Sequence, residues 1–161
     1  MMPVLFLDVD GVLNSEAWMR SGNWRGGKPE TQLDPACCAR LERIIVATRC
    51  ELVLSSSWRI THQRRNRYGV QRPVWFERML RKAGVPHARF VGQTPSLSFH
   101  RDRSHEIRAW LEANPRHDVF AIVDDDTTAG TIHPGQFVRT DGRVGLTEAN
   151  AGALVWLLGG R

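Results

Sequence analysis

The sequence predicts an α/β fold in which helices cover both faces of a mostly parallel, five-stranded sheet. Short apolar segments alternate along the chain with longer segments of helical periodicity, which is the pattern of βαβ units. The apolar segments are continuous rather than alternating, as expected for strands that are buried on both faces. Three of them end in acidic or serine clusters, and ligands of such sheets bind beyond the carboxyl ends of the strands. A three-layer α/β/α arrangement accounts for these observations.

The N-terminal part of the chain supplies two strands and one helix. Residues 4–7 form a short apolar run and are predicted to be a buried strand. Residues 14–33 contain several glycines and a proline, and we expect an irregular, flap-like segment there. A helix follows, with Asp34 as its N-cap and Pro35 at its first position. The apolar run at 51–55 is predicted to be the second strand.

The C-terminal part continues the alternation with three helices and three strands. Proline and glycine mark the ends of the helices: Pro73 precedes the first and Gly84 ends it, Pro115 stops the second, and Gly159 follows the third. In chain order, the predicted elements are a helix at 74–84, a strand at 88–92, a helix at 104–114, strands at 118–123 and 136–140, and a helix at 147–160.

Length and composition are those of a single globular domain that spans residues 1–161. No apolar run reaches about 18 residues, so we expect no membrane-spanning helix, and the N-terminus resembles a strand rather than a secretory signal. The three cysteines have no metal-ligand spacing and favour a reduced, cytoplasmic setting. The formal net charge of +5 would suit anionic partners such as phosphates or nucleic acid, although an arginine-rich composition also explains it.

Carboxylates follow two of the predicted strands, and serines follow a third. Asp8 and Asp125 would repel each other unless a cation lay between them, and hard oxygen ligands favour Mg²⁺ together with a substrate phosphate. An aspartate beside such a cation is able to attack phosphorus and form an aspartyl-phosphate. Asp10 would protonate the leaving oxygen and then activate water. Gly11 allows a sharp turn that exposes backbone N–H groups to phosphate oxygens.

The order of these motifs resembles that of the haloacid-dehalogenase (HAD) superfamily. The run "LFLDVDGVLN" is similar to the first motif of the superfamily, and Ser55 in "LVLSSSW" to the second. Asp124 and Asp125 in "AIVDDD" are similar to the acidic pair of the fourth motif. The resemblance covers residues 4–126 and extends to "GLT" at 145–147. It implies a Rossmann-like fold and phosphoester hydrolysis that depends on Mg²⁺.

The resemblance also implies a role for each matched residue. Asp8 resembles the nucleophile. Asp10 resembles the acid/base residue, which also gives a backbone carbonyl to the metal. Ser55 resembles the residue that hydrogen-bonds the phosphoryl group. Asp125 resembles the metal ligand, with Asp124 in support. The implied metal ligands are therefore Asp8, Asp10, Asp124 and Asp125.

Two of these assignments stay open at the level of the sequence. A register shift of one would make the acidic pair Asp125 and Asp126 instead of Asp124 and Asp125. The third motif of the superfamily usually supplies a lysine near a helix start, but no lysine lies there in this chain. Arg103 is our first choice for that role and Arg101 the second, because arginine keeps its charge and binds phosphate bidentately.

The site is expected to be open to large substrates, because too few residues follow the first motif or separate the second from the third to form a sizeable cap domain. The motifs also resemble those of the small HAD domains associated with RNA-repair proteins and of the phosphatase domain of phage polynucleotide kinase/phosphatase. These resemblances favour a phosphatase for nucleotide or nucleic-acid ends. The alternatives are a phosphatase for a small metabolite or phosphoprotein, and a catalytically silent scaffold that binds nucleic acid or a protein partner.

A basic segment after the second motif offers further contacts to anions. At its start, Ser56 and Arg59 are expected to contact phosphate, together with Gly11 and Arg101, whereas Trp58 is expected in the core. The segment either follows a phosphate backbone or forms a solvated face. Its arginines are Arg59, Arg64, Arg65, Arg67 and Arg72.

Overall fold

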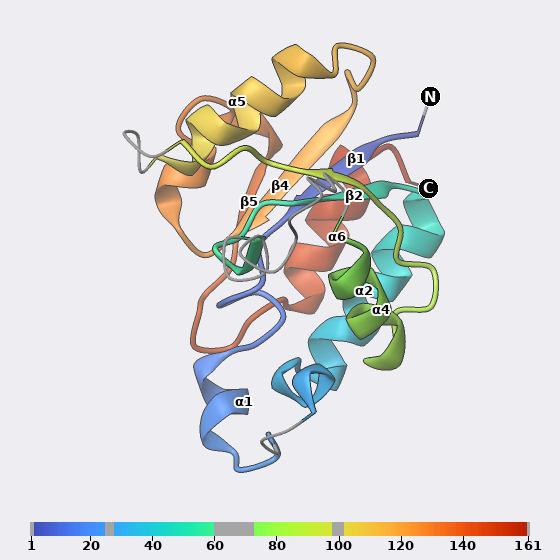
Figure 1. Ribbon diagram of the computed structural model, residues 1–161, viewed down its shortest axis with the longest axis vertical. Coiled ribbons are helices and arrows are strands. Elements are labelled where there is room, and N and C mark those ends of the chain that lie inside the picture. The colour runs from blue at the N-terminus through green and yellow to red at the C-terminus, as the bar shows by residue number, and fades with distance from the viewer. Residues whose placement is uncertain (1, 25–27, 60–72, 98–101, 161) are drawn as a thin grey trace.

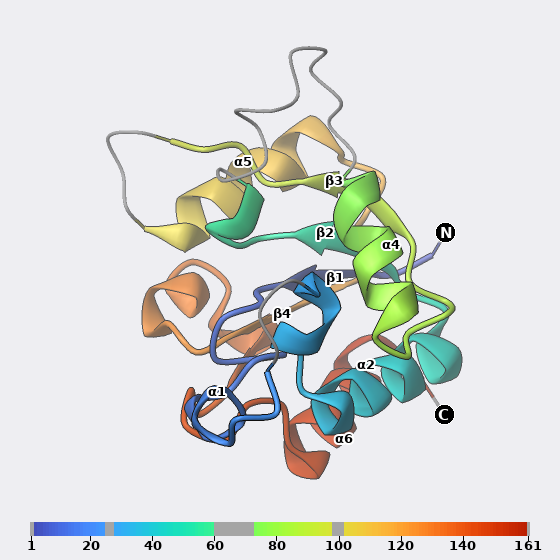
Figure 2. The same cartoon turned by 60° about the horizontal axis from the view of Figure 1, so that its bottom comes forward.

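The structure is a computed structural model that describes residues 2–24, 28–59, 73–97 and 102–160. Its centre is one sheet with the strand order β3-β2-β1-β4-β5, in which every pairing is parallel. Figure 2 shows β3, β2, β1 and β4 as successive neighbours. The predicted five-stranded α/β fold is therefore confirmed. The strands are β1 (Val4–Leu7), β2 (Glu51–Leu54), β3 (Phe90–Gln93), β4 (Phe120–Asp124) and β5 (Phe137–Arg139).

Helices cover both faces of this sheet and form the two outer layers. One helix, α5, lies on one side, while α2, α4 and α6 lie on the other (Figure 1). The predicted three-layer α/β/α arrangement is confirmed. The helices are α2 (Pro35–Thr48), α4 (Val74–Lys82), α5 (Arg103–Ala113) and α6 (Glu148–Leu157).

The central strand β1 is buried on both faces, as its unbroken apolar sequence predicts. Val4 and Phe6 face α5, where the Phe6 ring meets Trp110 edge-on at a centroid distance of 5.3 Å. Leu5 and Leu7 belong to the core on the opposite face. Burying a side chain of this size contributes roughly 1.5–3 kcal/mol, so β1 is anchored firmly and holds the residues that follow it.

The segment after β1 is more ordered than predicted. Residues 14–33 contain a short helix α1 (Glu16–Arg20) and a 3₁₀ helix η1 (Pro29–Gln32), so the expectation of an entirely irregular segment is wrong. The N-cap Ser15 explains α1, because its hydroxyl accepts the Trp18 backbone N–H at 3.1 Å. The described residues of this segment and of α4 form no separate cap domain.

The remaining helices begin and end close to their predicted bounds. Asp34 caps α2 by accepting the Ala36 N–H at 2.8 Å, as predicted. Helix α5 starts one residue earlier than predicted, because Asp102 acts as its N-cap. This places Arg103 in the first turn of α5. None of the helices in the described ranges is long and apolar enough to cross a membrane.

Candidate active site

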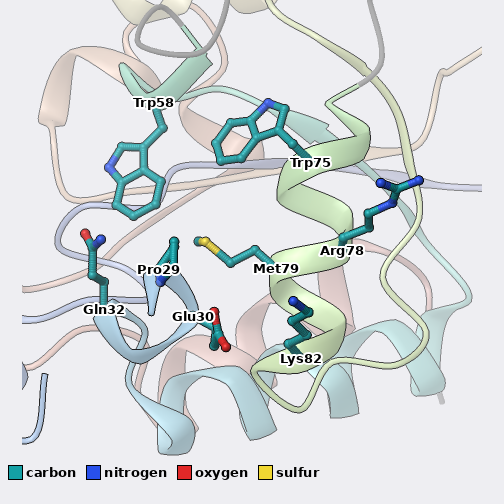
Figure 3. Close-up of a pocket in the computed structure, with 8 residues that line it drawn as sticks. All are labelled: Pro29, Glu30, Gln32, Trp58, Trp75, Arg78, Met79 and Lys82. Carbon is teal, nitrogen blue, oxygen red and sulfur yellow. The ribbon is translucent and has the colours of Figure 1, made fainter. Parts of the chain in front are cut away.

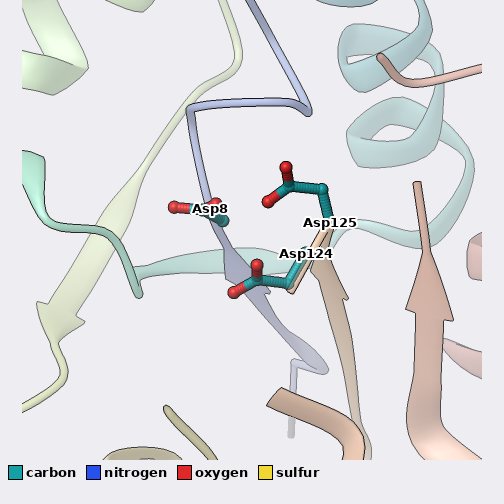
Figure 4. Close-up of side chains that lie close together, drawn as sticks. All are labelled: Asp8, Asp124 and Asp125. Atoms are coloured by element: carbon teal, nitrogen blue, oxygen red, sulfur yellow. The ribbon is translucent and has the colours of Figure 1, made fainter. Parts of the chain in front are cut away.

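Two neighbouring strands deliver three carboxylates to one point at the edge of the sheet. The register of β1 and β4 pairs Leu7 with Val123, so the residues that follow these two leave the sheet side by side. Oxygen atoms of Asp8, Asp124 and Asp125 all lie within 4.8 Å of one another. Figure 4 shows the three side chains gathered at the ends of β1 and β4.

Burial makes the negative charge of this cluster unfavourable. Asp8 is only 4% exposed, and burial raises the pKa of its carboxyl to about 6, although Arg103 and the Ser56 hydroxyl favour the charged form. Burial and then the charge of Asp8 raise the pKa of Asp124 to about 8. Burial also raises the pKa of Asp125. A cation among these carboxylates would relieve the repulsion and hold all three in the ionised form.

The donor atoms of the cluster fit a hard divalent cation. The buried Oδ2 of Asp124 has no hydrogen-bond partner within the described part of the chain, whereas its Oδ1 accepts the Asp126 N–H at 2.9 Å. A buried carboxylate oxygen without a hydrogen-bond donor suits a metal ligand better than a structural acceptor. Because all the side-chain donors are carboxylate oxygens, the cluster suits a hard divalent cation such as Mg²⁺.

The open question about the acidic pair is answered by the position of Asp126. Its side chain is exposed and caps the 3₁₀ helix η2 (Thr127–Gly130), where it accepts the Thr128 N–H at 2.9 Å. The carboxylates beside Asp8 are therefore those of Asp124 and Asp125, which is the first of the two predicted registers.

Gly11 makes room for the cluster at the turn after β1. Its φ of +74° lies in the left-handed region, and a Cβ at this position would lie 2.3 Å from Oδ2 of Asp125. The Thr140 hydroxyl donates to the Gly11 carbonyl at 2.9 Å and fixes the turn from the side of β5. Only glycine allows this backbone and the Asp125 carboxylate to lie so close together.

Asp10 is not one of the three clustered carboxylates, and two hydrogen-bond donors contact its side chain. The Asn14 amide donates to its Oδ1 at 2.8 Å, and the Trp58 indole N–H lies 3.0 Å from both of its carboxylate oxygens. The expectation that Trp58 is a core residue is met only in part: this side chain is partly buried and packs against the core, but its polar edge contacts Asp10. Sequence reasoning missed both donors, and only the position of Asn14 four residues after Asp10 offered a signal.

Arg103 connects the carboxylates with the second motif. Its Nη1 lies 3.5 Å from Oδ1 of Asp8, and its Nε lies 3.6 Å from Oδ2 of Asp124. It also donates from Nη1 to the Ser55 carbonyl. Of the two arginines considered for the third motif, Arg103 lies in the site, and Arg101 falls outside the described residues.

The serines after β2 border the cluster. The Ser55 hydroxyl is buried and has no hydrogen-bond partner within the described ranges, so it is free to donate to a bound anion. Ser56 is also buried, and its hydroxyl bonds the Asp8 carboxylate, which favours the charged form of that group. The structure thus gives Ser56 a contact with Asp8 in addition to the predicted role in phosphate binding.

Arg59 forms a buried ion pair with a residue of α5. Its side chain is only 4% exposed, and its Nη2 lies 2.6 Å from Oε2 of Glu106 on α5. Its Nη1 donates to the Ser56 carbonyl at 2.7 Å. Arg59 therefore fastens the second motif to α5 through a buried ion pair, and its contact with phosphate stays a prediction. The other arginines of the basic segment, Arg64, Arg65, Arg67 and Arg72, lie outside the described residues.

A parallel α/β sheet with this carboxylate cluster and an adjacent arginine has the layout of the HAD superfamily. Residues 4–151 match the family described as the HAD domain in Swiss Army Knife RNA repair proteins, and the chain belongs to this family. No curated protein and no solved structure matches the chain. Membership confirms the resemblance inferred from the motifs and implies a phosphatase-like hydrolase with a link to RNA repair.

Proposed function

We propose that this protein is a Mg²⁺-dependent phosphatase that hydrolyses phosphomonoesters on nucleotide or nucleic-acid ends through an aspartyl-phosphate at Asp8. The observation that carries the proposal is the convergence of Asp8, Asp124 and Asp125 within 4.8 Å, with Arg103 beside them. Membership in the RNA-repair HAD family supports both the chemistry and the choice of substrate class.

Asp8, Asp124 and Asp125 would hold the Mg²⁺, with the backbone carbonyl of Asp10 as the further ligand implied by the superfamily. Bound there, Mg²⁺ would reduce the negative charge of the carboxylates and of the phosphate, so that one anion can approach another. Arg103 adds a permanent positive charge on the side of Asp8.

In the first half of the reaction, a carboxylate oxygen of Asp8 attacks phosphorus, and the bond from phosphorus to the leaving oxygen breaks. Asp10, in its protonated form, gives its proton to that oxygen, so the alcohol leaves as a neutral group. Arg103 and the Ser55 hydroxyl donate to the phosphoryl oxygens, where negative charge gathers.

In the second half, Asp10 is a carboxylate and takes a proton from a water molecule. The oxygen of this water attacks phosphorus, the bond between phosphorus and the Asp8 oxygen breaks, and inorganic phosphate leaves. Asp8 is again a carboxylate and Asp10 is again protonated, so the cycle closes. The donors Asn14 and Trp58 keep Asp10 in position for both proton transfers.

The test is the release of phosphate from a panel of substrates in the presence of Mg²⁺. The panel contains an aryl phosphate, oligonucleotides with a 3′- or a 5′-phosphate, free nucleotides and sugar phosphates. We expect turnover that requires Mg²⁺, with the highest kcat/KM on nucleotide or oligonucleotide ends. Asp8→Asn should abolish it, whereas Asp118→Asn, which changes an exposed aspartate before β4, should not.

Two results would contradict the proposal in different ways. If oligonucleotides and nucleotides were the poorest substrates of the panel, the enzyme would act on a small metabolite or on a phosphoprotein. If the folded protein turned over no phosphoester with Mg²⁺ present, the chain would be a silent scaffold that binds a partner.

A further inference from the structure

We propose that the cavity between η1, Trp58 and α4 binds the terminal nucleobase of a single-stranded nucleic acid whose end phosphate lies at Asp8. This inference rests on the proposed function and specifies the part of the substrate that lies beyond the phosphate. The cavity has a volume of about 490 Å³, within the range of small-molecule sites.

Trp58 connects this cavity with the chemistry. Its indole forms one wall of the cavity, while its N–H lies 3.0 Å from both carboxylate oxygens of Asp10. Figure 3 shows the nitrogen edge of Trp58 turned away from Trp75 and Met79. Asp10 is the residue that would protonate the leaving oxygen. Because the Trp58 indole contacts Asp10 on one edge and lines the cavity with its ring, the cavity lies on the side of the site toward which the leaving group extends.

The apolar part of the cavity wall suits a flat aromatic ring. Trp58 and Trp75 both line it, and the Met79 side chain extends from α4 toward Pro29 (Figure 3). Phe76 supports both indoles, with ring centroids 5.8 Å from Trp58 and 5.2 Å from Trp75. Rings held in this way lose little freedom when a base packs on them, and stacking on aromatic side chains is how single-stranded nucleic acids are bound without strong sequence preference.

The polar side chains that line the cavity suit the edge of a base and the next phosphodiester of a strand. Glu30 and Gln32 line it from η1, and they offer oxygen acceptors and an amide donor to the edge of a base. Arg78 and Lys82 stand four residues apart on α4 and are both exposed. Within the described ranges no carboxylate pairs with either cation, so both are available to the next phosphodiester of the strand.

The test measures binding by calorimetry, with the full chain carrying Asp8→Asn to prevent turnover. The ligands are short oligonucleotides with a terminal phosphate at the 3′ or the 5′ end, the same oligonucleotides with an abasic terminal residue, and a mononucleotide that carries the same end phosphate. We expect the intact oligonucleotide to bind roughly 5- to 150-fold more tightly than the abasic one, as base–aromatic stacking provides. This ratio should fall close to one when Trp75→Leu is added.

Trp156→Leu is the matched control, because Trp156 on α6 is 78% exposed and does not line the cavity. It should leave the ratio as it is in the parent protein. The double variant Arg78→Gln/Lys82→Gln should weaken binding of the oligonucleotide more than binding of the mononucleotide and reduce the salt dependence of binding. Thermal unfolding of each variant checks that the fold is kept.

The outcomes separate this inference from the proposed function. An abasic ligand that binds as tightly as the intact one, or a ratio that Trp75→Leu leaves unchanged, would overturn the base site even if Asp8 is catalytic. The mononucleotide could instead bind as tightly as the oligonucleotide, with no effect of the Arg78/Lys82 variant. This result would show that the site takes free nucleotides, and it would overturn the inference that the ligand is a strand end. Binding is measured without turnover, so an inactive protein would still test the site.

Discussion

Replacing Glu106 by glutamine removes the negative partner of the buried Arg59 side chain. The two side chains are 10% and 4% exposed, and their charged atoms are 2.6 Å apart. The Glu106 carboxylate also accepts the Leu97 backbone N–H at 3.1 Å. Burial lowers the pKa of the Arg59 guanidinium, and the Glu106 carboxylate acts in the opposite direction to keep it charged. The variant would therefore leave a buried cation without its counter-charge.

Breaking a buried ion pair by removing one partner costs roughly 3–5 kcal/mol. For a chain of this size, each kcal/mol lowers the midpoint of thermal unfolding by roughly 2–4 °C, so we expect Glu106→Gln to lower it by about 6–20 °C. The control is Glu112→Gln, which removes one partner of the exposed pair with Arg108 on the same helix. It should change the stability by less than about 1 kcal/mol.

Thermal and urea unfolding, followed by circular dichroism, measure both variants. If Glu106→Gln destabilised the protein no more than Glu112→Gln, the assignment of Arg59 to a structural ion pair would be refuted. The double variant Arg59→Met/Glu106→Leu provides a second test. Replacing both charges by apolar groups of similar size should recover much of the lost stability, because neither charge is then left unpaired.

Three further predictions concern the site itself. Gly11→Ala should weaken Mg²⁺ binding roughly 10- to 100-fold in calorimetry, because its Cβ would lie 2.3 Å from Oδ2 of Asp125. The control Gly135→Ala should leave Mg²⁺ binding unchanged, because Gly135 has open space around it. Equal Mg²⁺ affinities of the two variants would contradict the geometry of the turn. Asp10→Asn should lower turnover of an alkyl phosphate by a factor of roughly 10²–10⁴, and turnover of an aryl phosphate with a good leaving group by a smaller factor. An equal loss on both substrates would argue against a role of Asp10 in protonating the leaving oxygen. In the presence of a chelator, the midpoint of thermal unfolding should fall as the pH rises from 5 to 8, because the raised pKa of Asp124, about 8, lets the folded state hold a proton that the unfolded state releases. Asp124→Asn should reduce this fall in the unfolding midpoint. Mg²⁺ should stabilise the protein more at pH 8 than at pH 5. If the midpoint of Asp124→Asn depended on pH as that of the parent protein does, the raised pKa of Asp124 would be contradicted.

The carboxylate cluster could be predicted from the sequence because strand ends are local features and a parallel sheet aligns them. The runs that end at Asp8 and Asp124 are apolar and short, and adjacent parallel strands bring such ends together whatever the intervening chain does. The same reasoning could not decide between Asp124 and Asp126, because the choice depends on which side chain caps the next turn.

The contacts that sequence reasoning missed join residues that are far apart in the chain. Trp58 is 48 residues from Asp10, and Arg59 is 47 residues from Glu106. No local pattern marks these partners, since a tryptophan beside a buried strand is more often a core residue and an arginine in a basic segment is more often exposed. Their roles follow from the way α5 and the second motif pack together, which appears only in three dimensions.

The proposed mechanism requires that Asp8 carries a phosphoryl group during turnover, and this group can be detected. A reaction with labelled substrate and Mg²⁺ is quenched rapidly in acid, and the peptides of the protein are analysed by mass spectrometry. We expect a transient phosphoryl group on the peptide that contains Asp8, absent without Mg²⁺ and absent in Asp8→Asn. Release of phosphate with no labelled protein, together with full turnover by Asp8→Asn, would contradict the proposed mechanism.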